Sequence, residues 1–313
     1  MTWKDFIWPV IGLLAVAVSA WLLYHELRGI SLDDVWDGLV AIPMRGWLLS
    51  ALAAIAAYAA LAGYDHIALL HIGKKVSWPF VTACSFTTYA LAHNIGGSVV
   101  SGAVIRYRAY VSRGLTGQEV GVLVAICLFT FLLSTVVVGA VVLILKPELM
   151  SRFADSDLIS FNFGRAAGFL LLALVIAYIF GSWLHLKPLK IKSFQIHYPA
   201  LPIVTRQLII GPLEIVAAAS IIYFVLPAEG NPGFLIILGI FLVSFSAALI
   251  SHAPGGLGVF EVVFLIGLPE MDPASVLAAL LVFRLFYLLI PFAIALLLVL
   301  VFERSQFGRR NRV

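Results

Sequence analysis

Charged residues are scarce in this chain of 313 residues. Asp, Glu, Lys and Arg make up 12% of it, while hydrophobic residues make up 62%. A soluble domain usually has about 25% charged residues. Apolar stretches of about 20 residues, the length that spans a bilayer as a helix, recur along the chain. The composition therefore predicts an all-α polytopic membrane protein, with residues 1–313 forming a single integral membrane domain.

Cysteine and catalytic motifs are also sparse. Cys84 and Cys127 lie in apolar stretches, which excludes a disulfide framework, and their neighbours do not have metal-ligand spacing. The sequence lacks a nucleophile elbow, a P-loop, a zinc-protease motif and a dinucleotide fingerprint. We therefore expect no catalytic residue, no metal, no cofactor and no nucleic-acid partner, and we do not expect an enzyme.

The first apolar stretch, at about residues 6–23, has two interpretations. Val18-Ser19-Ala20 resembles a signal-peptide cleavage site, but the apolar run continues through Trp21-Leu22-Leu23 and favours an uncleaved span. Further unbroken spans are predicted at about 47–70, 116–145, 166–183, 204–226 and 273–302.

Two segments carry helix-start signals. Ser31 precedes the acidic, Trp-bearing segment 32–37, which fits a short helix at the membrane interface. Thr116-Gly117-Gln118-Glu119 is a capping box, so Glu119 is expected to start the helix that reaches about Leu145.

One pattern, S-F-x6-H-x-x-G-G, occurs twice. Its copies begin at Ser85 and Ser244, and each residue of the second lies 159 positions after its counterpart. A glycine inside a helix costs roughly 1 kcal/mol relative to alanine. We interpret the two copies as matched breaks in two apolar stretches, at about 79–110 and 234–268.

The distribution of basic residues predicts an inverted repeat. With the N-terminus in the cytoplasm, 14 of the 20 Lys and Arg face the cytoplasm, as the positive-inside rule requires. This holds if each broken stretch is re-entrant, the first from the cytoplasm and the second from outside. The halves, about 1–150 and 160–313, are then inverted, as in many secondary transporters. Residues 234–251 are also long enough to cross fully, so six to eight transmembrane helices are expected.

Broken helices at membrane depth require a covered or water-filled cavity, and their ends suit an anionic guest. The candidate cavity residues at the two breaks are His93, Gly96, Gly97, His252, Pro254, Gly255, Gly256 and Gly258. The alternative is that the glycines permit close packing and the histidines pack against neighbouring helices.

Basic residues after the first break are candidates for binding a phosphate. Arg106 and Arg108 could hold it bidentately, with Tyr107 at the level of the headgroups. The alternative is that these are ordinary arginines at the cytoplasmic boundary.

Ionisable residues inside the apolar stretches are expected to pair within the bundle. We predict Asp65 with Arg106 or Arg108, and Glu261 with Arg284. Direct contact with substrate and purely structural pairing both remain open for them. Glu214 follows Gly211-Pro212, which suggests a kink and exposure to the cavity.

Four stretches carry a family resemblance. They are Tyr64-Asp65, residues 102–115, residues 252–261 with the pattern His-x-Pro-Gly-Gly-x-Gly-x-x-Glu, and residues 279–291. Together they resemble the lysylphosphatidylglycerol synthase membrane region. In full-length relatives this region acts as a flippase for aminoacylated phosphatidylglycerol, and a separate cytosolic domain makes the lipid. Since the sequence ends at Val313, the resemblance implies a free-standing member without the synthase domain.

The sequence therefore favours a phospholipid flippase or lipid transporter of the bacterial inner membrane, with both termini cytoplasmic. A second copy of the chain or a lipid-modifying enzyme is a candidate partner. One alternative is a membrane subunit that anchors or regulates such an enzyme without transporting lipid. Another is an intramembrane transferase acting on lipid-linked sugars, with Asp65 or Glu261 as its base.

Overall fold

The computed structural model describes residues 31–95, 98–153, 161–184, 189–191, 194–196, 198–251 and 253–310. The predicted span at 6–23 lies outside these residues. In chain order the helices are α2 (Leu32–Ala41), α3 (Met44–His71), α4 (Trp78–Ile95), α5 (Ser98–Val111), α6 (Gly117–Leu145), α7 (Phe161–Trp183), α8 (Leu201–Tyr223), α9 (Phe234–Ser251), α10 (Val259–Gly267), α11 (Pro273–Phe283) and α12 (Ile290–Arg310).

Short elements connect some of these helices. They are 3-10 turns at Pro147–Arg152 and Pro254–Gly256, a π-helical segment at Arg284–Leu289, and the antiparallel strands β1 (Leu189–Ile191) and β2 (Phe194–Ile196). Lys190 pairs with Gln195 in this two-stranded ribbon. The described part of the chain is otherwise helices and loops, which confirms the all-α prediction.

Six helices are long and apolar enough to cross a membrane, which confirms a polytopic membrane protein. They are Met44–His71, Gly117–Leu145, Phe163–Trp183, Leu201–Tyr223, Phe234–Ser251 and Pro273–Phe302. The last combines α11, the π-helical segment and α12.

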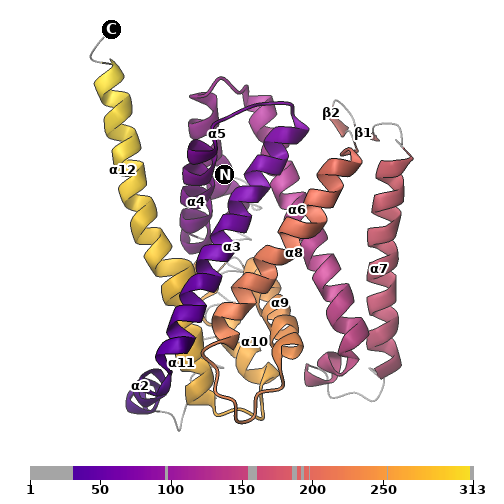
Figure 1. The fold of residues 1–313 in the computed structure, drawn as a ribbon, viewed down its shortest axis with the longest axis vertical. Coiled ribbons are helices and arrows are strands. Elements are labelled where there is room, and N and C mark those ends of the chain that lie inside the picture. Colours follow the sequence, from indigo (N-terminus) through magenta and orange to yellow (C-terminus); the bar gives the residue numbers. More distant parts are fainter. Residues whose placement is uncertain are drawn as a thin grey trace, which may run out of the picture.

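Two helix hairpins lie at opposite ends of the bundle. In Figure 1, α4 descends from the upper end and α5 returns to it, whereas α9 rises from the lower end and α10 returns there. The two helices of each hairpin pack against each other. This is the arrangement that two inverted re-entrant hairpins require. Their entry from opposite faces of the bilayer stays a prediction.

The second predicted break is confirmed. Between α9 and α10 the backbone of Gly255, Gly256 and Gly258 takes positive φ angles of 61°, 64° and 82°. Side chains other than glycine rarely adopt this conformation, so the motif residues allow the chain to reverse. At the first break, Gly96 and Gly97 lie outside the described residues, with α4 ending at Ile95 and α5 beginning at Ser98.

Small residues allow α3 to pack closely along α8. An added Cβ at Gly63 would lie 2.8 Å from the Ile210 side chain, and one at Gly46 would lie 2.8 Å from the Phe224 carbonyl oxygen. The Ser50 hydroxyl also donates to the Ile221 carbonyl oxygen at 2.6 Å. Close approach and interhelical hydrogen bonds are what hold helices together where lipid is the solvent.

Both predicted caps are present. The Ser31 side chain accepts from the Asp34 amide and the Asp34 side chain returns a bond, which begins α2. Thr116 and Glu119 form the same reciprocal arrangement at the start of α6. Glu119 additionally pairs with Lys74 at 2.9 Å, so it joins the α3–α4 connection to α6.

At the lower end, Arg152 fastens the second hairpin to the turn that follows α6. Its guanidinium donates to the Gly267 carbonyl oxygen at 2.8 Å and pairs with Glu270 at 2.7 Å. This hydrogen bonding from Arg152 lowers the pKa of Glu270.

Gly256→Ala should destabilise the protein because alanine disfavours the left-handed conformation by about 1–2 kcal/mol. The added methyl group would also lie 2.7 Å from Ala248 Cβ. We expect a lower thermal-unfolding midpoint in detergent. The matched control is Gly121→Ala, at an exposed position of α6 with open space around it. That substitution should be neutral or stabilising by up to about 1 kcal/mol. Equal midpoints for the two variants would contradict a required left-handed break.

Candidate functional site: a cavity between the two hairpins

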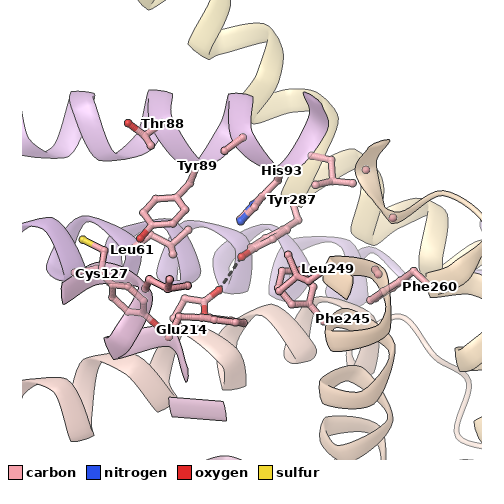
Figure 2. Close-up of a pocket in the computed structure, with 18 of the residues that line it drawn as sticks. Leu61, Thr88, Tyr89, His93, Cys127, Glu214, Phe245, Leu249, Phe260 and Tyr287 are labelled. Carbon is pink, nitrogen blue, oxygen red and sulfur yellow. Dashed lines mark hydrogen bonds between the residues drawn. The ribbon is translucent and has the colours of Figure 1, made fainter. Parts of the chain in front are cut away.

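A cavity of about 470 Å³ lies where the two hairpins meet the long helices. Its lining comes from α3, α4, α5, α6, α8, α9, the second break, α10, α11 and the π-helical segment. Figure 2 shows several of these side chains converging on the space. The polar or ionisable side chains of the lining are Tyr64, Thr88, Tyr89, His93, Arg106, Cys127, Glu214, Arg284 and Tyr287. The predicted cavity therefore exists, with side chains from before and after the middle of the chain.

The first predicted ion pair, Asp65 with Arg106, is confirmed. Arg106 Nη2 lies 2.7 Å from Asp65 Oδ1, and Arg106 Nε lies 3.2 Å from both carboxylate oxygens. Tyr110 donates to Asp65 Oδ2 at 2.8 Å, and Cys127 Sγ lies 3.5 Å from Oδ1. Both members of the pair are buried. The Asp65 carboxylate thus accepts several hydrogen bonds, and it holds Arg106 at the edge of the cavity.

The second predicted pair, Glu261 with Arg284, is also confirmed. Arg284 Nε donates to Glu261 Oε1 at 2.6 Å, and Arg284 Nη2 also pairs with that oxygen. Arg284 Nη1 donates to the Gly255 carbonyl oxygen at 3.0 Å. The other carboxylate oxygen of Glu261 accepts from the Gly258 amide at 2.8 Å. Glu261 therefore caps α10 and joins the second break to the last long helix.

The structure places Arg106 and Arg108, predicted to hold one phosphate together, in different surroundings, and phosphate binding by either stays a prediction. Arg106 is buried and lines the cavity, whereas Arg108 and Tyr107 are exposed and lie outside the described lining. Residues two apart on a helix do not face each other. The Tyr107 ring instead lies beside Gly117 at the start of α6.

Of the predicted break residues, His93, Gly255 and Gly256 line the cavity. The His93 ring stacks on Tyr287, with ring centroids 5.4 Å apart. Its Nδ1 is buried and has no hydrogen-bond partner among the described residues. Pro254 begins the 3-10 turn, and Gly258 precedes α10. Gly96, Gly97 and His252 lie outside the described residues.

The π-helical segment shapes the cavity. A π-helical turn leaves carbonyl groups misaligned with the helix ladder. Here the Tyr287 carbonyl oxygen accepts from Tyr58 at 2.9 Å, and the Leu288 carbonyl oxygen accepts from Asn94 at 3.2 Å. Helices α3 and α4 thereby hold the segment that carries Arg284 and Tyr287.

Sequence reasoning did not include Tyr287 among the candidates and left Glu214 outside the proposed pairs. Tyr287 Oη donates to Glu214 Oε1 at 2.7 Å, and Figure 2 shows this bond between two of the side chains that line the cavity. A lone acidic residue in an apolar span was the available signal for Glu214. The corresponding signal for Tyr287 was weaker, because it lies one turn beyond Arg284 in an otherwise apolar helix.

The cavity wall has a definite charge pattern. Among the described lining residues, Arg106 and Arg284 are basic and Glu214 is acidic, while Asp65 and Glu261 lie behind the two arginines. Apolar side chains such as Phe131, Phe245 and Leu249 form much of the remaining wall. The described residues include no cluster of three metal-ligating side chains. This lining suits an amphipathic guest with an anionic group.

Asp65→Asn should destabilise the protein by about 3–5 kcal/mol because Arg106 would keep a buried charge without its partner. The double variant Asp65→Asn/Arg106→Gln should recover most of that loss, since it leaves no unpaired charge. Thermal or denaturant-induced unfolding in detergent measures the stability change of the single and of the double variant. The control is Glu148→Gln, which breaks the exposed Lys146–Glu148 pair and should change stability by less than about 1 kcal/mol. A loss in Asp65→Asn no larger than in the control would show that the buried pair does not support the fold.

Comparison with known proteins identifies the family. The sequence matches the lysylphosphatidylglycerol synthase TM region over residues 11–295. It is 30% identical to the uncharacterized protein slr0712 of Synechocystis, over 82% of this chain and 79% of that protein. It is 26% identical to the inner membrane protein YbhN of Escherichia coli, over 97% of this chain and 91% of that protein.

Phosphatidylglycerol lysyltransferase of Staphylococcus haemolyticus is 34% identical over a shorter stretch, which is 33% of this chain and 12% of that enzyme. The similarity to the lysyltransferases is to their membrane region. The chain belongs to the lysylphosphatidylglycerol synthase TM region family of membrane proteins.

Proposed function

We propose that the protein is a phospholipid flippase or lipid transporter of the bacterial inner membrane. The observation that carries this proposal is the cavity, in which the buried guanidinium group of Arg106 and the half-buried one of Arg284 face a largely apolar wall. A phospholipid headgroup offers an anionic phosphate for the guanidinium groups, while its acyl chains stay in the bilayer. Membership of a membrane-region family that includes stretches of phosphatidylglycerol lysyltransferases, and similarity to an inner membrane protein, support the same substrate class and location.

Arg106 is the residue we assign to the phosphate. Asp65 engages its Nε and Nη2, so Nη1 is not used in the ion pair. Its guanidinium also lies 4.7 Å from the centre of the Tyr89 ring, which fixes its plane. Charge-assisted hydrogen bonds from arginine to phosphate are among the stronger polar contacts in proteins. A fixed guanidinium with an unused edge can bind a phosphate without losing its carboxylate.

Alternating access would follow from movement of the two halves about the cavity. In this proposal the halves are inverted, the hairpins are re-entrant from opposite faces and both termini are cytoplasmic. The ion pair Glu261–Arg284 joins the second break to the last helix and therefore moves with the second half. The hairpin of α4 and α5 moves with the first half, together with the ion pair of Arg106 and Asp65.

Headgroup translocation in proteoliposomes tests the proposal. The purified protein is reconstituted with a headgroup-labelled phosphatidylglycerol, and the label in each leaflet is measured with a membrane-impermeant quencher. Asp65→Asn/Arg106→Gln removes the guanidinium without leaving a buried charge, and it should slow translocation at least about tenfold, the equivalent of about 1.4 kcal/mol. Glu148→Gln is the control and should match the unmodified protein.

Two outcomes would contradict the assignment. Full translocation by the folded double variant would remove Arg106 from the binding site. An unmodified protein that moves no lipid, yet co-purifies with a lipid-modifying enzyme, would favour a non-transporting subunit.

A further inference from the structure

Glu214 differs from the other two buried carboxylates. Asp65 and Glu261 each pair with an arginine, whereas the described residues give Glu214 no basic partner. The hydrogen bond it accepts comes from the neutral hydroxyl of Tyr287. Glu214 is 4% exposed and lines the cavity. It is therefore a titratable group that can reach the cavity but not bulk solvent.

Apart from the two cavity arginines, the titratable side chains of the described residues around Glu214 are tyrosines, a cysteine and a histidine. Tyr58 and Tyr64 of α3 lie near the carboxylate, and Tyr287 of the π-helical segment bonds to it. From α6, Cys127 lines the same cavity, and from α4 His93 stacks on the Tyr287 ring. Helices α9 and α11, which also pack against α8, contain no titratable residue, and the tyrosine of α7, Tyr178, bonds instead to Gln207.

A lone carboxylate in this setting is costly when ionised. Removing an ionic group from water costs several kcal/mol unless a partner of opposite charge compensates. A bound proton removes the charge, and Tyr287 can still donate to the carbonyl oxygen of the neutral carboxyl group. Because the carboxyl group borders a cavity, the proton can leave to water there and return from it.

The two cavity arginines link this proton to the cargo. Arg106 and Arg284 line the same space as Glu214, so a phosphate bound by them shares the cavity with the carboxylate. Two negative charges in one low-dielectric site repel each other. The phosphate and the proton on Glu214 should therefore bind together.

We propose that Glu214, held by Tyr287, is a proton-binding site of the cavity and that an anionic phospholipid headgroup crosses together with its proton. The coupling rests on the proposed lipid transport, whereas the proton site does not. In the cycle, Glu214 takes a proton from water on one side of the membrane, the O–H bond persists during the movement, and the proton passes to water on the other side. The carboxylate that remains is protonated again when the cavity returns.

Infrared difference spectroscopy of the purified protein tests the proton site without any lipid cargo. We expect a protonated-carboxyl band that disappears as the pH is raised and that is missing in Glu214→Gln. Glu148→Gln, on the exposed turn after α6, should keep the band. A Glu214 signal that does not change at any pH at which the protein stays folded, or a titrating band that survives in Glu214→Gln, would overturn the proton site.

Proteoliposomes with a pH gradient test the coupling. Headgroup-labelled phosphatidylglycerol should accumulate in the leaflet facing the more alkaline side, because protons flow toward that side. Glu214→Gln should move lipid without this asymmetry, and Glu148→Gln should retain it. Lipid movement by the unmodified protein that ignores the gradient would overturn the coupling. A titrating Glu214 in a protein that moves no lipid would instead refute the proposed transport and leave the proton site standing.

Discussion

The Glu261 carboxylate binds the amide that begins α10 and the guanidinium of Arg284 at the same time. The rest of the cavity depends on this contact. The start of a helix needs an acceptor for its free amides, and an arginine among apolar helices needs a counter-ion. One carboxylate meets both needs, and Arg284 in turn satisfies the Gly255 carbonyl group of the break. The left-handed glycines can therefore interrupt the helix without leaving these polar groups unpaired.

The π-helical segment extends this arrangement to the other helices. It begins at Arg284, and its misaligned carbonyl groups are met by Tyr58 from α3 and Asn94 from α4. The same local widening places Tyr287 against Glu214 of α8. The irregular backbone thus provides hydrogen-bonding groups where three helices meet, which is where irregular structure is tolerated in a membrane protein.

Sequence reasoning recovered the features that follow from local rules. Within the described residues, the apolar runs predicted the spans and the capping boxes at Ser31 and Thr116 predicted helix starts. The cost of ionisable groups in lipid predicted both ion pairs. It failed where the answer depends on which face of a helix a side chain occupies. Arg106 and Arg108 are equivalent by composition, yet α5 turns Arg106 inward and Arg108 outward. The contact between Glu214 and Tyr287 joins residues 73 positions apart, and it depends on a π-helical turn that no local sequence pattern predicts.

The ion pairs of the two hairpins have opposite charge arrangements, yet both place an arginine at the cavity. In the hairpin of α4 and α5, Arg106 lies on the hairpin and its partner Asp65 lies on the preceding long helix. In the hairpin of α9 and α10, Glu261 lies on the hairpin and its partner Arg284 lies on the long helix that follows. In both cases the arginine faces the cavity and the carboxylate lies behind it. If the proposed headgroup binds in the cavity, it meets a guanidinium group of either pair, and Glu214 is the described lining residue whose charge can oppose it. In the proposed transport, binding energy that is the same in the inward-facing and outward-facing orientations cannot drive net movement of lipid. The direction of transport must then come from a group whose charge differs between the two orientations.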